Sequence, residues 1–250
     1  MKNLIIFLKK EFEDYKILFR NIPSPVVTIF VLSVVCANLM ANKELINYKY
    51  IALDCGFAFS WVMFLCMDMI CKRWGAKASV KISVYALSLN LLVCASFFIL
   101  SQTSGNWGEF YTALEHSSQT GSTVNNALNK TFGGSWYIVL GSSLAFLISS
   151  IINALLNRKI GLLLKKDNFT SFAIRSYVST FIAQFVDNLT FATVVSKVFF
   201  GWTWTQIFAC SIVAACFELF CEVLFSKLGY KITKSWQKEN VGQEYIDLQK

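Results

Sequence analysis

The stretch YVSTFIAQFVDNLTFATVVSKVFF, residues 177–200, decides which class of fold this chain can adopt. At about 1.5 Å per helical residue it is long enough to cross a hydrocarbon core about 30 Å thick. Its apolar residues do not alternate strictly with polar ones, so the pattern predicts a membrane helix and not a strand of a membrane barrel. Yet Gln184, Asp187 and Asn188 lie near its middle. A carboxylate at that depth needs a partner or a cavity.

Five further stretches of similar length and hydropathy occur along the chain. The composition agrees, with 55% apolar residues, 15% charged residues and a mean hydropathy of +0.51, whereas soluble domains average about 25% charged residues. We place the six spans at residues 25–42, 50–71, 80–101, 135–157, 177–200 and 204–226. The sequence therefore predicts that residues 1–250 form one all-α, polytopic membrane domain built as a six-helix bundle.

Lysine and arginine residues are concentrated in the connections on one side of this bundle. Of the 23 in the chain, all but Lys43, Lys49, Lys130 and Lys197 lie there. By the positive-inside rule that side faces the cytoplasm, which places both termini in the cytoplasm and the protein in the inner membrane. The net charge of +8 is then a consequence of topology and of contact with the lipid bilayer. Nucleic acid is not an expected partner, because no surface interleaves basic and aromatic residues.

Two segments flank the predicted spans. Residues 1–22 begin with an apolar run but lack a small-residue cleavage site, so we expect an interfacial helix on the inner leaflet and not a signal peptide. Pro23 and Pro25, the only prolines, would end that helix. Its apolar face comprises Phe7, Leu8, Phe12, Tyr15 and Phe19. Residues 227–250 are expected to form a cytoplasmic tail.

The longest connection, residues 102–134, is predicted on the outer face. Its Trp107, Phe110 and Tyr111 are too apolar for a freely solvated loop, so we expect a lid that closes over a binding site. His116, the only histidine, lies in this loop and is expected to be exposed.

The eight cysteines lie in or next to the predicted spans and form no C-x-x-C pair. This distribution is typical of small apolar packing residues. With a single histidine in the chain, no metal-ligand spacing is present. We therefore expect neither a metal site nor a cofactor.

Polar residues recur at helical spacing inside three of the predicted spans. Gln184, Asp187 and Asn188 form an i, i+3, i+4 set, so they project from one helix face. A four-residue spacing also relates Glu218 and Glu222 in span six. In span four it relates Ser149, Asn153 and Asn157. Hydrogen bonding between helices explains amides and hydroxyls equally well, but burying a carboxylate only for packing costs far more, so Asp187 indicates a cavity or a ligand.

Three other ionisable residues fall within the predicted spans, namely Asp54, Asp68 and Lys197. Asp68 lies one helical turn from Lys72 and Arg73, so its position is consistent with a structural ion pair and equally with a functional role. Lys197 is a candidate counter-ion for an acid in span six, although its position is about 15 Å along the helix from Asp187.

Three segments carry a family resemblance. They are CMDMICKRWGAKASVKI (66–82), SSLAFLISSIINALLNRKI (142–160) and RSYVSTFIAQFVDNLTF (175–191). They resemble the queuosine precursor transporter family, also called the vitamin uptake transporter family. The most specific part is the pattern S-T-x-x-x-Q-x-x-D-N-x-x-F, which begins at Ser179 and ends at Phe191. The resemblance implies six transmembrane helices, a fold like that of the substrate-binding (S) components of energy-coupling factor transporters, and import of deazaguanine bases.

Such a ligand matches the chemistry of span five. A 7-deazaguanine presents an N1–H beside an exocyclic amine, and the Asp187 carboxylate can accept from both, while Asn188 or Gln184 donates to the neighbouring carbonyl. Aromatic residues can stack on the flat base, for which Phe57, Trp61, Phe110 and Phe191 are candidates. The predicted substrate-binding residues are Gln184, Asp187, Asn188, Asn153, Ser149, Glu218, Glu222, Phe191 and Phe110. Glu218 stands where many family members carry a lysine, which leaves the exact base open.

The sequence thus predicts a transporter and not an enzyme. An intramembrane serine protease needs a histidine within a span, and an aspartyl one needs G-x-G-D, which is absent. The expected substrate is a queuosine precursor, such as queuine, or a similar purine-like small molecule. The alternative is the S component of an energy-coupling factor transporter for another vitamin-like molecule. Because no G-x-x-x-x-G-K-[ST] motif is present, ATP dependence would then require energy-coupling partner subunits. Assembly as a homodimer is also open.

Overall fold

The computed structural model describes residues 2–41, 43–105, 107, 118–134, 136–164 and 166–249. Its α-helices are α1 (Lys2–Asn21), α2 (Ser24–Met40), α3 (Phe57–Trp74), α4 (Ala76–Gln102), α6 (Ser118–Gly133), α7 (Trp136–Leu163), α8 (Phe169–Phe191), α9 (Lys197–Phe200), α10 (Trp204–Lys238) and α11 (Gln243–Leu248). A π-helical turn, η1 (Ala192–Ser196), joins α8 to α9, and strands β1 (Glu44–Tyr48) and β2 (Ile51–Asp54) form one antiparallel hairpin.

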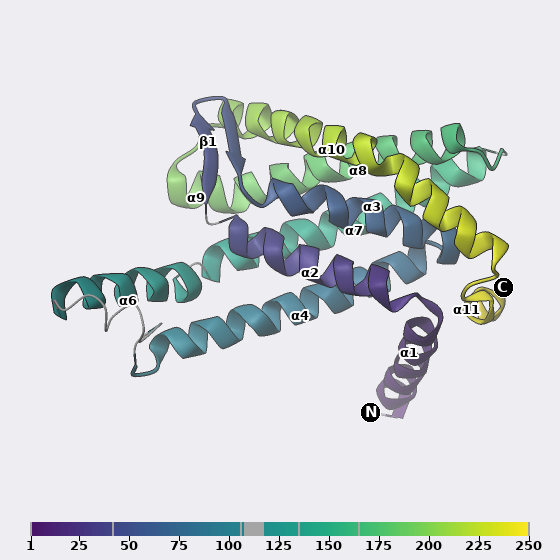
Figure 1. Ribbon diagram of the computed structural model, residues 1–250, viewed down its shortest axis with the longest axis horizontal. Helices are drawn as coiled ribbons and strands as arrows, with labels where there is room; N and C mark the ends of the chain where they lie inside the picture. Colours follow the sequence, from purple (N-terminus) through teal and green to yellow (C-terminus); the bar gives the residue numbers. More distant parts are fainter. Residues whose placement is uncertain are drawn as a thin grey trace.

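Six long helices, α2, α3, α4, α7, α8 and α10, run side by side along the long axis of the molecule (Figure 1). The β-hairpin, α6 and α9 lie at one end of this bundle, whereas α1, α11 and both termini lie at the other. Four helical stretches, which contain α4, α7, α8 and α10, are long and apolar enough to cross a membrane, and a fifth is counted if α1 and α2, bent by 110°, form one span. The all-α, polytopic membrane fold expected from the sequence is confirmed.

Each predicted span overlaps one of the six long helices, although several boundaries differ: α7 runs on to Leu163, α8 already begins at Phe169, and residues 192–200 of the fifth span form η1 and α9. Two further differences have a clear structural cause. The second span was expected from residue 50, whereas residues 51–54 form strand β2 and α3 begins at Phe57. Leu53 is buried while its strand neighbours are not, so the apolar signal there comes from a half-buried strand. Gly56 makes this junction possible, because a Cβ atom at that position would lie 2.7 Å from the Ala37 carbonyl oxygen.

The sixth span was expected to end near residue 226, but α10 continues to Lys238. Its last three turns stay helical because their inner face still packs on α3. Gly229 lies against α3 so closely that a Cβ atom there would come within 2.9 Å of Leu65. The predicted tail, residues 227–250, is therefore an extension of the bundle followed by α11.

Helix α3 forms the centre of the bundle. Nine successive residues, Met63 to Cys71, are all buried, so this helix is enclosed on every side. Helices α2, α4, α7 and α10 surround it, and α8 packs between α7 and α10. The outward faces of α8 and α10 expose apolar side chains, as lipid-facing helices do. Examples are Ile174, Val178 and Ile182 on α8, and Phe217, Phe220 and Leu224 on α10.

Helix α1 corresponds to the predicted N-terminal interfacial helix, and α6 lies within the connection that was predicted as a lid. Phe7, Leu8 and Phe12 on α1 are more than half exposed, as an interfacial face requires, whereas Phe19 packs on Tyr85 of α4. The break at Pro23 is confirmed, since α1 ends at Asn21 and α2 begins at Ser24. The second half of the 102–134 connection is helix α6, which packs on α4. Residues 108–117, which include Phe110, Tyr111 and His116, lie outside the described residues.

Candidate functional site

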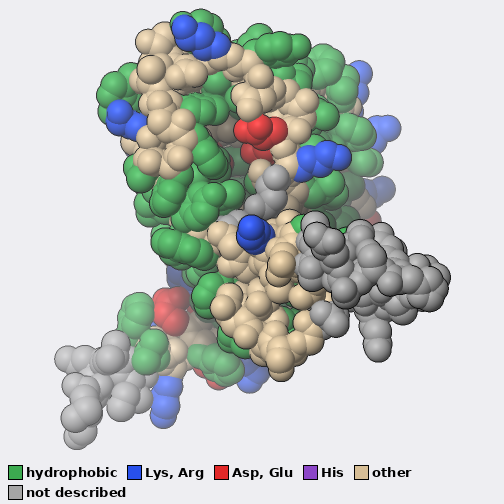
Figure 2. Space-filling view, turned by 90° about the vertical axis from the view of Figure 1, so that its left-hand side faces the viewer, with side chains coloured by type: hydrophobic (Ala, Val, Ile, Leu, Met, Phe, Trp, Pro, Cys, Tyr) green, Lys and Arg blue, Asp and Glu red, His purple; other side chains and the backbone are tan. Residues whose placement is uncertain are grey.

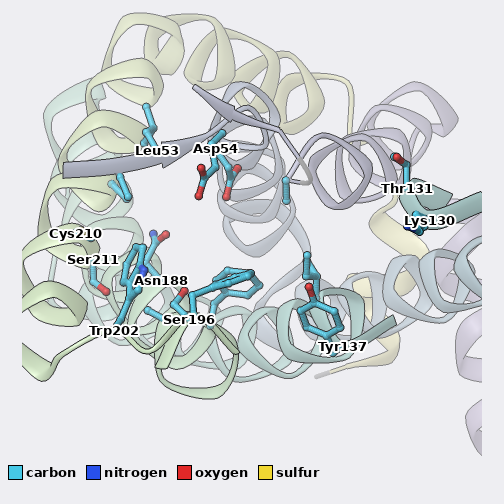
Figure 3. Close-up of a pocket in the computed structure, with 18 residues that line it drawn as sticks. Leu53, Asp54, Lys130, Thr131, Tyr137, Asn188, Ser196, Trp202, Cys210 and Ser211 are labelled. Atoms are coloured by element: carbon cyan, nitrogen blue, oxygen red, sulfur yellow. The ribbon is translucent and has the colours of Figure 1, made fainter. Parts of the chain in front are cut away.

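A large cavity opens at the end of the bundle that carries the β-hairpin, and it has a volume of about 680 Å³. Strand β2, α6, α7, α8, η1 and α10 all contribute to its wall. The residues labelled in Figure 3 are Leu53, Asp54, Lys130, Thr131, Tyr137, Asn188, Ser196, Trp202, Cys210 and Ser211. Viewed from this end, acidic side chains lie near the middle of the face (Figure 2). We call this space the outer cavity.

A second, smaller cavity of about 70 Å³ adjoins it toward the middle of the bundle. Four residues, Ala41, Asp54, Asn188 and Phe191, line both spaces. The inner cavity additionally exposes two carboxylates, those of Asp187 and Glu218. The two cavities together therefore form one path from the outer end of the molecule to acids within the bundle.

Hydrogen bonds from neighbouring helices hold the two inner carboxylates in place. The Ser149 hydroxyl of α7 donates to Oδ1 of Asp187 at 2.7 Å. The Ser60 hydroxyl of α3 donates to Glu218 at 2.5 Å, and Nδ2 of Asn188 donates to the other Glu218 oxygen at 3.1 Å. Among the described residues, the other carboxylate oxygen of Asp187 has no hydrogen-bond partner. That oxygen is available to a ligand.

Asp54 joins this site through the β-hairpin. The residue follows the last buried position of β2, and the Gly56 N–H donates to its Oδ1 at 2.7 Å. Burial raises the pKa of Asp54 to about 6, and the nearby Glu44 charge adds to the rise. The sequence predicts Asp54 as an ionisable residue within the second membrane helix, whereas the structure places it in strand β2. The short polar turn at Lys49 and Tyr50 was the signal for a hairpin that would bring it to the cavity.

The sequence-predicted site residues divide into two layers. Asp187, Asn188, Glu218 and Phe191 line the cavities, and Ser149 supports Asp187. Asn153 and Glu222 belong to neither cavity and instead lie with Asp68 deeper in the bundle.

Gln184 is fully buried between the two layers. Both atoms of its side-chain amide lack a hydrogen-bond partner among the described residues. Phe110 lies outside the described residues. Of the other candidate stacking residues, Phe57 and Phe191 line the inner cavity, whereas Trp61 stacks on Phe225 of α10 at 4.5 Å between ring centroids.

The two charge pairings that the sequence left open do not form. Lys72 pairs with Asp167 at 2.8 Å, and Arg73 donates to the Val241 carbonyl, so neither forms an ion pair with Asp68. Lys197 lies over the ring of Trp204, 4.7 Å from its centroid, and forms no ion pair with Glu218. Both lysines lie near the ends of their helices. There a long side chain can place its ammonium group near water or an aromatic ring, which costs less free energy than placing it beside a buried acid.

The helix that carries the site changes its geometry immediately after Phe191. Residues 192–196 form a π-helical turn, and such turns occur frequently at functional sites. Helix α7 approaches this turn closely at Gly141, where a Cβ atom would lie 2.2 Å from Cγ2 of Val195. This contact between α7 and η1 fixes the wall of the outer cavity.

Comparison with known families identifies this architecture. Residues 54–232 match the family model described as "Putative vitamin uptake transporter". The chain belongs to the vitamin uptake transporter family. The match begins at Asp54 and includes every cavity-lining acid except Glu44. A search of curated proteins and a search of solved structures gave no match.

Membership in this transporter family accounts for the combination of features seen here. The chain is a multi-pass membrane protein whose large outer cavity, among the described residues, leads from one end of the bundle toward buried polar groups. A transporter needs such a one-sided path to a site near the middle of its bundle.

Proposed function

We propose that this family member imports a queuosine precursor, a 7-deazaguanine base such as queuine, across the inner membrane. The observation that supports this proposal is the junction of the two cavities. There Asp187 offers a carboxylate oxygen that no described residue bonds, beside Phe191 and Asn188 on the same side of α8.

The dimensions of the two cavities restrict how a base can bind. A volume of about 70 Å³ is too small for a purine-sized base, whereas about 680 Å³ lies within the usual range for small-molecule sites. The body of the base would therefore lie in the outer cavity, with its polar edge directed to the inner one. In this pose the N1–H and the exocyclic amine approach the Asp187 carboxylate, and the ring stacks on Phe191.

Gln184 is a better candidate than Asn188 for the donor to the carbonyl of the base, because the N–H groups of the Asn188 amide are already used. The Asn188 amide nitrogen already donates to Glu218 and to the Gln184 carbonyl oxygen, at 3.1 and 2.9 Å. The Gln184 amide lies about one helical turn from Asp187 and has no partner among the described residues, and because it lines neither cavity its side chain must turn toward the inner one to meet the base. A ligand that satisfies it would remove the cost of a buried, unpaired amide.

The ends of the molecule support the proposed orientation. Helices α1 and α11 and both termini lie together, opposite the outer cavity (Figure 1). Lys72, Lys81 and Lys234 lie at the same end and pair with acidic residues there. We place this end in the cytoplasm, because loops rich in lysine and arginine remain on that side.

Uptake of labelled queuine and its deazaguanine precursors tests the proposal. Cells that lack their own queuosine synthesis and uptake would express the wild type, Asp187→Asn, or the control Glu239→Gln, which changes an exposed glutamate just after the end of α10. We expect uptake by the wild type and the control but not by Asp187→Asn. An analogue without the exocyclic amine should compete at least about tenfold less well, since the carboxylate would then lose one charged hydrogen bond.

Failure of the wild type to move any of these bases would refute the substrate assignment. Binding of a base without uptake by the purified protein in liposomes would instead indicate an S component that depends on energy-coupling subunits.

A further inference from the structure

A second polar cluster lies deeper in the bundle than the inner cavity. Its centre is Ser176 of α8, whose hydroxyl lies within hydrogen-bond distance of two carboxylates, Asp68 of α3 and Glu222 of α10. Asn153 of α7 donates to Asp68 at 2.7 Å, and Thr180 donates to the same carboxylate at 3.2 Å. All five side chains are fully buried. Four helices therefore meet at a pair of acids that no solvent reaches.

The proton count at Ser176 requires one of these acids to be protonated. A serine hydroxyl has a single proton and can donate to only one oxygen. If both acids were ionised, one contact with Ser176 would join two oxygens with no proton between them. Since the Ser176 contact with Glu222 is 2.6 Å long, that arrangement would be repulsive. One of the two carboxyl groups must therefore donate its own proton to Ser176.

The surrounding groups assign this proton to Glu222. Asp68 receives donors from Asn153, Thr180 and Ser176, which stabilise its ionised form. Glu222 has fewer donors: Ser176 lies at 2.6 Å, the single Thr180 proton is directed to Asp68, and Oε2 of Glu222 has no hydrogen-bond partner among the described residues. An unpaired carbonyl oxygen of a neutral acid costs less than an unpaired oxygen of a carboxylate. The resulting chain runs from the Glu222 carboxyl group, through Ser176, to the Asp68 carboxylate.

The charged and titratable groups around the pair lie on three helices. Arg175 of α8, next to Ser176 in the chain, carries the nearest described positive charge on that helix and bonds to Asn157 of α7 at 2.9 Å. The Cys71 thiol of α3 donates to the Ala154 carbonyl oxygen. On α10, Glu218 lies one turn from Glu222 toward the inner cavity.

A spare acceptor allows the cluster to take up a further proton. Oδ1 of Asn153 is buried and lacks a partner among the described residues, although the Nδ2 of the same amide donates to Asp68. If Asp68 became protonated, rotation of this amide would present Oδ1 to the new O–H. The Asn153 side chain can thus serve either charge state of Asp68.

The cluster lies between two openings. Along α8, Asp187 in the inner cavity is eleven residues from Ser176, or about 16 Å. On the other side, Arg175 lines a separate cavity of about 190 Å³ at the cytoplasmic end, together with Lys72 and Asp167. The acid pair therefore separates the outer path from the cytoplasmic one.

We propose that Asp68, Ser176 and Glu222 form a proton-binding site that couples import to the transmembrane proton gradient. In this structure the pair is closed to solvent on both sides, and protons would reach it from the outer cavity when the bundle opens along α8 past Gln184. They leave past Arg175 when the bundle opens to the cytoplasm, because the guanidinium favours the ionised acids. The coupling role rests on the proposed import function, whereas the presence of the bound proton does not.

Infrared spectroscopy of the purified protein tests the bound proton without any substrate. At neutral pH, we expect Glu222→Gln to remove one carboxylic-acid C=O band, because the glutamine amide replaces the carboxyl group as the donor to Ser176. The matched control is Glu239→Gln, which changes an exposed glutamate just after the end of α10 and should retain the band. An unchanged acid band in Glu222→Gln would overturn the proton site.

Transport in proteoliposomes tests the coupling, with labelled queuine as the probe. If one proton moves with each base, an inward pH difference of about one unit supports up to about tenfold accumulation by the wild type. Glu222→Gln should lose this accumulation but keep queuine exchange, which needs no driving force. Accumulation that persists in the variant, or that a sodium gradient drives instead, would overturn the coupling.

The two readouts also separate this inference from the proposed substrate. If the wild type shows no queuine exchange, the substrate assignment fails, and the infrared result then supports or overturns the proton site by itself.

Discussion

Replacing Asp187 with asparagine isolates one oxygen atom of the candidate site. Ser149 donates to Oδ1 of Asp187 at 2.7 Å, and an asparagine oxygen can keep that bond. The other position changes from an acceptor with negative charge to an N–H₂ donor, which would face a donor on the base. A hydrogen bond to a charged group contributes about 1.5–3 kcal/mol. The affinity for a 7-deazaguanine base should therefore fall about 10- to 150-fold.

Isothermal titration of the detergent-solubilised protein measures this loss directly. The control is Ser149→Ala, which leaves the carboxylate but removes its positioning donor and should weaken binding by about tenfold or less. The melting temperature of each variant shows whether the bundle remains folded. If Asp187→Asn binds the base within twofold of the wild type, Asp187 does not contact the ligand. The proposed pose would then be refuted.

Three further predictions concern the scaffold. Because burial raises the pKa of Asp54 from 3.8 to about 6, the folded protein holds this proton more tightly than the unfolded chain between those values. Its stability should therefore fall by up to about 3 kcal/mol as the pH rises from about 4 to about 6, and Asp54→Asn should remove that fall in melting experiments. Gly141→Ala should cost about 1–3 kcal/mol, because its Cβ would lie 2.2 Å from the stiff Val195 side chain. Adding Val195→Ala should restore much of the loss, and an additive double variant would contradict this explanation. Lys81→Ala removes the ammonium group that bridges α1 to α4 through Glu11 at 2.5 Å. Chymotrypsin should then cleave within α1 about tenfold faster, and an unchanged rate would show that apolar packing alone docks α1.

The helical fold followed from properties that are local in the sequence. A long apolar run must satisfy its backbone hydrogen bonds internally in lipid, so each of the six runs could be predicted as a helix. The break at Pro23 was equally local, because proline lacks the N–H that a helix interior requires. The start of α3 was missed because Ile51–Leu53 belong to a strand that packs on distant helices. A short apolar segment cannot reveal such a partner by itself.

In the candidate site, too, the local features could be predicted from the sequence, whereas contacts between distant residues could not. The spacing of Gln184, Asp187 and Asn188 predicted one polar face of α8, because helical periodicity fixes which side chains share a face. It could not predict that Asn188 would use its amide on Glu218, since that contact joins residues 30 positions apart. Nor could the four-residue spacing of Glu218 and Glu222 assign them to different layers. That outcome depends on which neighbouring helix supplies a hydroxyl at each depth.

The sequence by itself thus determined that this chain spans a membrane as a helical bundle, with carboxylates and amides at defined positions along its helices. Hydropathy, helical period and charge bias are sums over neighbouring residues, which explains why they could be read without coordinates. Only the tertiary structure decided the environment of each carboxylate. Asp187 lines a cavity, whereas Asp68 shares a buried serine with Glu222. The charge state of a buried acid depends on donors from several helices, and only packing brings those donors together.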